Sequence, residues 1–254
     1  MSTTKSPASK KSAAVRKTEL VVALDFSDRV QAEHLIDTLS GLDVIYKVGL
    51  ELFIASGPDL VKRLVRDQRR IFLDLKLFDI PNTVMKACER IAELNVEWTT
   101  VHVLGGKDML RASMTPSESA DRASRTRPKI LGVTVLTSFS DEGWGEVSGD
   151  AFGKTQSVDE SVRALALRAE VMQLDGIVCS ARELLDLRER FPRLLMVVPG
   201  IRPEGEGADD QARVMTPLKA AKAGADAIVV GRPITQSTDP RKTTQQILND
   251  IALL

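Results

Sequence analysis

The segment DLKLFDIPNT, residues 74–83, continues an apolar run that begins at residue 71 and has the composition of a buried strand. Three charged residues, Asp74, Lys76 and Asp79, interrupt it. Because side chains alternate between the two faces of a strand, Asp74 and Lys76 share one face and the intervening leucines share the other. A buried ion pair seldom repays its desolvation and contributes little stability. The segment therefore predicts a strand that ends in a preorganised electrostatic site.

Similar apolar runs recur along the whole chain. Eight of them, rich in β-branched residues, cover residues 19–26, 43–50, 70–77, 98–104, 129–136, 175–180, 194–201 and 226–232. Segments with apolar residues at spacings of three and four lie between them, as at residues 84–94 and 162–174, and are typical of helices. The runs are almost continuously apolar, which indicates strands covered on both faces. Eight such units predict a single-domain α/β fold, the TIM (β/α)8 barrel.

The main structural alternative is a doubly wound open sheet. The glycine-rich G-x-G-x-x-G turn that often follows the first strand of that fold does not occur here, so we favour the barrel. Residues 138–157 are rich in Gly and Ser and break the alternation after the fifth run. On a barrel they predict a long loop over the carboxyl-terminal end of the strands, where active sites lie.

Composition limits the class of protein. The chain has 254 residues, a formal net charge of zero and 43% hydrophobic residues, and none of its apolar runs approaches the roughly 18 to 20 residues of a membrane span. Two cysteines without metal-ligand spacing indicate a reduced, cytoplasmic protein. Residues 1–18 contain five basic and no acidic residues, and we expect a disordered extension before a barrel domain at residues 19–254. The acidic remainder argues against nucleic acid as the main partner.

Polar residues gather toward the carboxyl-terminal ends of the predicted strands, where a barrel brings them to one mouth. They are Asp25, Lys47, Asp74, Lys76, Asp79, His102, Thr137, Arg202, Gly231 and Arg232. Arg202, Gly231 and Arg232 lie at the ends of the seventh and eighth strands, and the loops after these strands usually bind phosphate in this fold. Arg232 can donate several hydrogen bonds to a dianion. His102 could be catalytic, but we favour a barrel-lining histidine with a structural hydrogen bond. With two histidines in the chain and lysines among the carboxylates, we expect no metal site.

Together these segments resemble the orotidine 5′-phosphate decarboxylase family in its bacterial form. The resemblance runs from residue 19 onward through VALDF (22–26), YKVGLELF (46–53), FLDLKLFDIPNTV (72–84), VTVLTS (133–138), DGIVCSARE (175–183), VVPGIRP (197–203), DDQAR (209–213) and AIVVGRPI (227–234). It implies a carboxy-lyase that converts orotidine 5′-monophosphate (OMP) to UMP, the last step of pyrimidine nucleotide biosynthesis, without metal or organic cofactor. It also implies a homodimer.

The resemblance assigns roles to individual residues. Lys76 would donate a proton to C6, with Asp74, Asp79 and Lys47 completing an alternating charge network. Asp79 and Thr83 would act in the partner's active site, and Ile80 beside them would contact the substrate. Asp25 and Lys47 would hold the ribose and Thr137 the pyrimidine. The phosphate would bind to Arg202, Gln211, Gly231 and Arg232. The loop at 138–157, with Trp144, matches no motif of the family.

Two other functions stay open at this point. A magnesium-dependent sugar-phosphate decarboxylase or aldolase of the same barrel superfamily would use a similar mouth. A non-catalytic or nucleic-acid-binding barrel would act through the basic residues of the amino-terminal segment.

Overall fold

The computed structural model describes residues 17–115, 127–149, 156–203 and 215–253. Eight parallel strands form a closed barrel in which each strand pairs with the next in the sequence and the last pairs with the first. They are β1 (Glu19–Ala23), β2 (Ile45–Gly49), β3 (Arg70–Leu77), β4 (Trp98–His102), β5 (Lys129–Val133), β6 (Gly176–Val178), β7 (Leu195–Val198) and β8 (Ala227–Val230). Each lies within one of the eight predicted runs, so the TIM barrel is confirmed.

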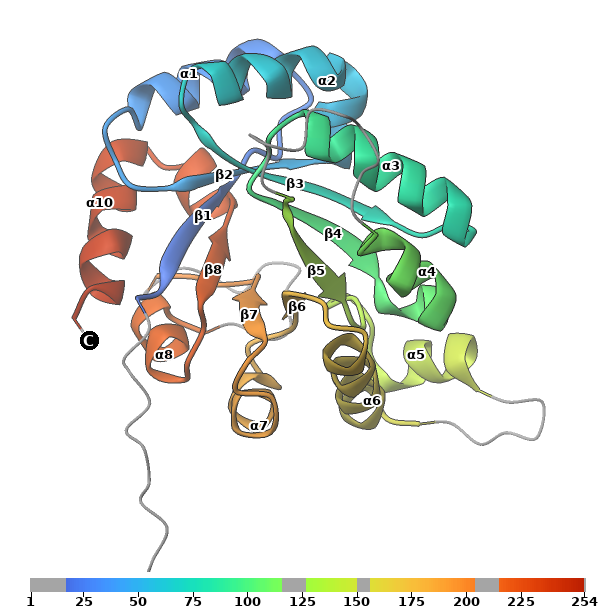
Figure 1. Ribbon diagram of the computed structural model, residues 1–254. Coiled ribbons are helices and arrows are strands. Elements are labelled where there is room, and N and C mark those ends of the chain that lie inside the picture. Colours follow the sequence, from blue (N-terminus) through green and yellow to red (C-terminus); the bar gives the residue numbers. More distant parts are fainter. Residues whose placement is uncertain (1–16, 116–126, 150–155, 204–214, 254) are drawn as a thin grey trace, which may run out of the picture.

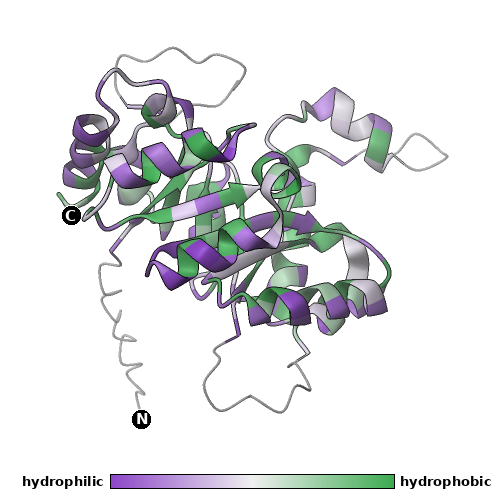
Figure 2. Cartoon of the chain, turned by 90° about the horizontal axis from the view of Figure 1, so that it is seen from above, coloured by the Kyte–Doolittle hydropathy of each residue, from purple (hydrophilic) through white to green (hydrophobic). Residues whose placement is uncertain are grey.

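Helices surround the strands (Figure 1). They are α1 (Arg29–Thr38), α2 (Leu50–Arg66), α3 (Pro81–Glu93), α4 (Gly106–Ser113), α5 (Asp141–Ser148), α6 (Val158–Val171), α7 (Leu184–Arg190), α8 (Pro217–Lys222), α9 (Arg232–Thr235) and α10 (Pro240–Ile251), with a 3₁₀ turn η1 (Val103–Gly105). In Figure 2 the outer helices carry both hydrophilic and hydrophobic residues, whereas the strands are mainly hydrophobic. Within the described ranges, the helices all fall short of the length and apolarity that crossing a membrane would require.

Local sequence signals explain where several helices begin. Pro81 occupies the first turn of α3, and Ile80 before it is extended, with φ −58° and ψ 151°, as expected for a residue that precedes proline. Ser157 and Glu160 form a reciprocal capping box at the start of α6. These two signals fix the first turns of α3 and α6.

The structure changes our interpretation of residues 138–157. The segment is not a continuous loop, because residues 141–148 form α5, which Ser140 caps by accepting a hydrogen bond from the Gly143 amide. Trp144 is buried, contacts the ring of Phe139 edge-on and donates a 2.8 Å hydrogen bond from Nε1 to Ser161 Oγ in α6. The tryptophan therefore anchors α5 to the body of the barrel. Residues 150–155 lie outside the described part.

The interior of the barrel is a small apolar cluster, separate from the larger core between strands and helices. It contains Val21, Ala23, Ile45, Phe72, Trp98, Leu131, Val197, Ala227 and Val229. These residues follow the two-residue period of a strand, so the next inward positions toward the mouth are 25, just after β1, 47 on β2 and 74 on β3. The apolar layer thus supports a polar layer directly above it.

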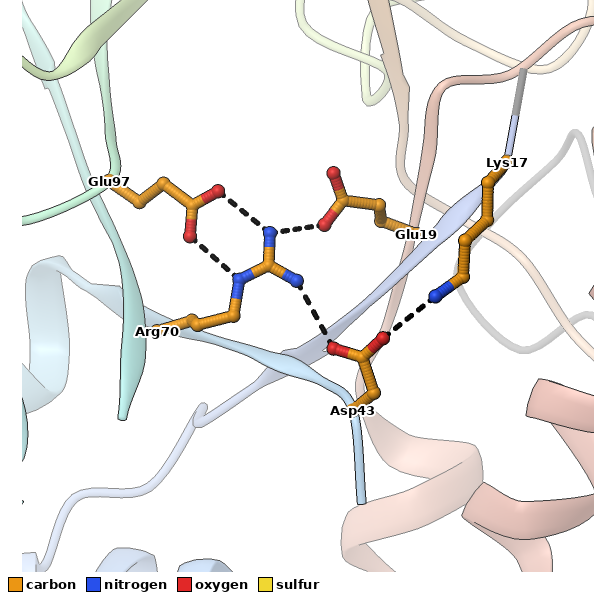
Figure 3. A network of polar contacts seen from close by, with 5 residues as sticks. All are labelled: Lys17, Glu19, Asp43, Arg70 and Glu97. Carbon is orange, nitrogen blue, oxygen red and sulfur yellow. Dashed lines mark hydrogen bonds and ion pairs between the residues drawn. The ribbon is translucent and has the colours of Figure 1, made fainter. Parts of the chain in front are cut away.

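The opposite, amino-terminal end of the barrel carries a charge network (Figure 3). Arg70 at the start of β3 donates two hydrogen bonds to Glu97, of 2.8 and 2.7 Å, and further bonds to Glu19 and to Asp43, the last of 3.3 Å. Lys17 donates to Asp43 at 2.8 Å. The network ties together the beginnings of four strands. It also shows that residue 17, which we assigned to the extension, contacts the barrel.

Thr18 likewise belongs to the folded unit. Its side chain is buried and donates a 2.8 Å hydrogen bond to the Ala225 carbonyl. The structure therefore describes contacts for the last two residues of the predicted 1–18 extension, and residues 1–16 lie outside the described part.

Candidate active site

Four alternating charges occupy the polar layer above the apolar interior. Lys76 Nζ lies 2.7 Å from Asp74 Oδ2, and Lys47 Nζ lies 3.8 Å from the same oxygen and 3.0 Å from Asp25 Oδ1. Asp74 is only 6% exposed, so it needs these cations as partners. The predicted shared face of Asp74 and Lys76 is confirmed by their common place in the cavity. Positive and negative side chains therefore alternate in a preorganised row. We call this row, Asp25, Lys47, Asp74 and Lys76, the charge layer.

These charges form part of the wall of a cavity of about 540 Å³. On its other sides the cavity is lined by Leu136 and Thr137 after β5, Pro199, Gly200 and Arg202 after β7, and Gly231 and Arg232 after β8. The Arg202 side chain is almost completely buried. Gly200 has φ +79°, a left-handed conformation that favours glycine. The cavity therefore combines a charged region, an apolar region and a cationic region from the loops after β7 and β8.

The structure brings together most of the predicted site residues. Asp25, Lys47, Asp74, Lys76, Thr137, Arg202, Gly231 and Arg232 all line the cavity. Gln211 lies outside the described residues. Asp79, Ile80 and Thr83 are exposed and are not part of the cavity wall in a single chain. Asp79 Oδ1 accepts a 2.6 Å hydrogen bond from the Ile80 amide, and the Ile80 side chain is 66% exposed.

His102 lies on β4 at the edge of this charge layer. Its ring lies 5.6 Å from the ring of Phe78, and its Nδ1 atom is buried without a hydrogen-bond partner in the described part of the chain. The structural hydrogen bond that we expected is therefore not seen at Nδ1. Burial, reinforced by the nearby charge of Lys76, lowers the pKa of His102, while Asp74 acts in the opposite direction. The imidazole is consequently neutral near pH 7.

Sequence reasoning missed one residue that contacts the charge layer, Thr100 of β4. Its hydroxyl lies 2.9 Å from Asp74 Oδ1 and 2.9 Å from the backbone nitrogen of Lys76. A threonine in an apolar strand does not suggest a functional site, because threonine is common in strands. The signal that could have identified it is the period of two from Trp98, which points into the barrel.

The described residues contain no cluster of three or more His, Cys, Asp or Glu side chains that could hold a metal ion. The carboxylates of the cavity are instead paired with lysines. A divalent cation at these carboxylates would have to compete with the lysine ammonium groups.

Comparison with known proteins gives the family. The model of the orotidine 5′-phosphate decarboxylase / HUMPS family matches residues 18–247. The chain belongs to this family. It is 42% identical over 235 residues to the orotidine 5′-phosphate decarboxylase of Saccharophagus degradans, which covers 92% of this chain and 95% of that protein. It is 43% identical over 238 residues to the enzyme of the same name from Gluconobacter oxydans, with 93% and 98% covered.

A solved structure supports the same family membership. The crystal structure of orotidine 5′-phosphate decarboxylase from Lactobacillus acidophilus has a TM-score of 0.81 and 36% sequence identity, and the match covers 92% of this chain and 99% of that one. The resemblance found in the sequence motifs is thus confirmed for the family and for the fold.

Proposed function

We propose that this protein decarboxylates OMP to UMP, with Lys76 as the proton donor. The observation that carries the proposal is the Lys76–Asp74 pair of 2.7 Å, which lines the same cavity as Gly231 and Arg232. A nucleotide monophosphate has a dianionic phosphate at one end and a polar base at the other. The arginines after β7 and β8 match the phosphate, and the two lysines and two aspartates of the charge layer match the polar part of the nucleotide. The family membership supports the same reaction.

The chemistry explains why an ammonium group is needed. Loss of CO2 breaks the bond between C6 of the pyrimidine and the carboxylate carbon, and the electron pair stays on C6. The pair lies in the ring plane, where the π system does not delocalise it, so stabilisation of charge at this atom must supply most of the barrier reduction. The Lys76 ammonium attracts the developing carbanion and then transfers an Nζ proton to C6, which yields UMP and leaves a neutral amine.

The remaining cavity residues bind and orient the substrate in this proposal. Arg202, Gly231 and Arg232, together with Gln211, hold the phosphate, Asp25 and Lys47 hold the ribose hydroxyls, and Thr137 contacts the pyrimidine. Because the phosphate is remote from C6, its binding energy can hold the ring against Lys76 without taking part in the reaction. No cofactor takes part in any step.

We further propose that the active form is a homodimer in the cytoplasm. Phe78 and Ile80 are 60% and 66% exposed, and they flank Asp79 immediately beyond the cavity. An apolar pair of this kind at the mouth is suited to contact with a second subunit. Asp79, Ile80 and Thr83 would then complete the partner's site. Both cysteines are buried and free, which suits a reducing compartment.

The decisive experiment follows the absorbance of OMP after addition of the purified protein in the presence of EDTA. We expect turnover that the chelator does not reduce, and no activity on keto-sugar phosphates with magnesium. Lys76→Ala should abolish decarboxylation while the protein keeps its thermal transition and binds UMP. Substantial turnover by Lys76→Ala, or dependence of the wild-type protein on magnesium, would contradict the proposal.

The amino-terminal segment offers a second test. A protein that lacks residues 1–16 retains Lys17 and Thr18, which contact the barrel. It should decarboxylate OMP at the wild-type rate, because the cavity lies at the other end of the strands. Loss of activity would favour a role for the basic segment.

A further inference from the structure

We propose that Thr100 is a positioning residue that fixes the proton donor Lys76 and its partner Asp74. The inference rests on the proposed function, since it concerns the same site. Thr100 is 0% exposed and is not part of the cavity wall, so it does not touch the substrate. It acts on the reaction only through the two residues that it holds.

The pairing between β3 and β4 shows why such a residue is needed. Leu73 pairs with Thr99, and the next pair joins Leu77 to Val101, so that β3 uses four residues where β4 uses two. The two strands are therefore out of step across residues 74–76, and regular backbone pairing is interrupted there. Asp74 and Lys76, the two residues of the proposed proton-donor pair, lie inside this irregular segment.

Lys76 itself has an unusual backbone. Its φ is +48°, the left-handed region that side chains other than glycine rarely adopt, and such a conformation persists only where the surroundings hold it. The Thr100 hydroxyl supplies one such restraint by accepting a 2.9 Å hydrogen bond from the Lys76 amide. A side chain of β4 thus replaces the backbone partner that the interrupted pairing does not provide.

The direction of both hydrogen bonds follows from the chemistry of the hydroxyl. An amide N–H can only donate, so Thr100 Oγ1 accepts from Lys76 with a lone pair. The single hydroxyl proton is then free for Asp74 Oδ1, at 2.9 Å. With Oδ1 occupied in this way, Oδ2 is the oxygen that meets the two ammonium groups, at 2.7 Å from Lys76 and 3.8 Å from Lys47.

The Thr100 hydroxyl therefore positions the proposed proton donor in two ways. It fixes the backbone from which the Lys76 side chain departs, and it fixes the plane of the carboxylate that holds the Lys76 ammonium. Catalysis of this kind is sensitive to displacements of the order of 1 Å. Binding of the nucleotide, by contrast, depends on the phosphate and ribose contacts elsewhere in the cavity.

Thr99 provides a matched control. It is the neighbouring residue on β4, is also 0% exposed, and also donates a 2.9 Å hydrogen bond to β3, but to the Leu73 carbonyl. Because side chains alternate along a strand, Thr99 points away from the charge layer. Thr99→Val and Thr100→Val remove the same atom from adjacent buried positions, and they differ in whether the lost contact involves Asp74 and Lys76.

The experiment compares kcat and KM for OMP, the Kd of UMP, and the thermal transition in wild type, Thr99→Val, Thr100→Val and Thr100→Ser. We expect kcat of Thr100→Val to fall roughly 10- to 100-fold, the factor for one lost hydrogen bond to a charged group. KM and the UMP Kd should stay within about threefold of wild type, because the phosphate and ribose contacts are intact. Thr100→Ser should restore kcat, and Thr99→Val should keep it while it lowers the thermal transition.

Amide hydrogen exchange at Lys76 gives a readout independent of turnover. Exchange should be faster in Thr100→Val than in wild type or Thr99→Val, since the amide loses its acceptor. If Thr100→Val does not fold, Thr100→Ala removes the same hydroxyl without adding a methyl group. An unchanged kcat and unchanged exchange in the folded variant, an equal loss of kcat in Thr99→Val, or failure of Thr100→Ser to restore kcat would overturn the inference. Wild-type protein that does not turn over OMP would refute the proposed function instead, while the exchange comparison would still decide the role of Thr100.

Discussion

Arg70 offers a quantitative test of what stabilises the amino-terminal end of the barrel. The Arg70→Met substitution keeps most of the aliphatic length but removes hydrogen bonds to three carboxylates, those of Glu97, Glu19 and Asp43. Hydrogen bonding to Glu97 raises the pKa of the guanidinium above its ordinary value, so the cation is present at every usable pH. Without it, three carboxylates face one another without their common partner.

The magnitude follows from exposure. Removing one partner of a fully buried ion pair costs about 3–5 kcal/mol, whereas an exposed pair contributes about 0–1 kcal/mol. The Arg70 side chain is 36% exposed, and Glu97 and Glu19 are 30% and 29% exposed. Discounted for solvent screening, the expected loss of unfolding free energy is about 2 kcal/mol. For a chain of this length that corresponds to a fall in Tm of roughly 4–8 °C.

The assay is urea denaturation and a thermal scan at pH 7.5, with Arg69→Met as the matched control. Among the described residues, the Arg69 side chain donates one hydrogen bond, of 3.2 Å, to the neutral Ser40 hydroxyl, so its loss should cost no more than about 0.5 kcal/mol. We also expect Arg70→Met to keep wild-type kcat at temperatures where it is folded, because the network is at the end of the barrel opposite the cavity. Equal stabilities of the two variants, or a large loss of kcat in folded Arg70→Met, would refute the reasoning.

Three further predictions concern the mouth of the barrel. Arg232→Ala should raise KM for OMP by about 10-fold or more through the lost phosphate contact, and unchanged KM and kcat/KM in steady-state kinetics would count against that role. If Asp79 acts in the partner's site, an equimolar mixture of inactive Lys76→Ala and Asp79→Ala proteins should recover roughly a quarter of wild-type activity after subunit exchange; no recovery in exchanged dimers would exclude the shared site. Because burial lowers the pKa of His102, the unfolded chain binds the proton first, and stability should fall as pH drops below about 6.5. Urea denaturation at pH 7.5 and 5.5 should show a smaller fall in unfolding free energy for His102→Phe than for wild type.

Much of the charge layer could be predicted from sequence because it depends on the simplest property of a strand. Side chains alternate, so Asp74 and Lys76 had to share a face, and their place near a strand end predicted the mouth of a barrel. The structure confirms that both line one cavity with Asp25 and Lys47. This prediction required only the two-residue period of a strand and the order of the strands in the sequence.

Other features depend on contacts that a linear pattern does not contain. The role of Thr100 follows from the break in pairing between β3 and β4 and from the left-handed backbone of Lys76. A sequence gives neither the register of two strands nor the dihedral angles at a bulge. Similarly, Gly and Ser around Trp144 predicted a loop, but the burial of the indole against α6 and the Ser140 cap form α5. Tertiary packing there overrides local propensity.

A charged residue within a barrel strand is not by itself evidence of an active site, and β3 shows why. Arg70, Phe72, Asp74 and Lys76 are successive positions on one face of the same strand. Arg70 is surrounded by carboxylates from the beginnings of the neighbouring strands (Figure 3), so its charge is neutralised by ion pairs that stabilise the fold. Lys76, three steps along the same face, meets a carboxylate on one side and a cavity on the other. The charge of Lys76 is therefore available to a substrate, and we expect neutral substitutions at the two positions to have opposite consequences: loss of stability without loss of catalysis at residue 70, and loss of catalysis without loss of the fold at residue 76.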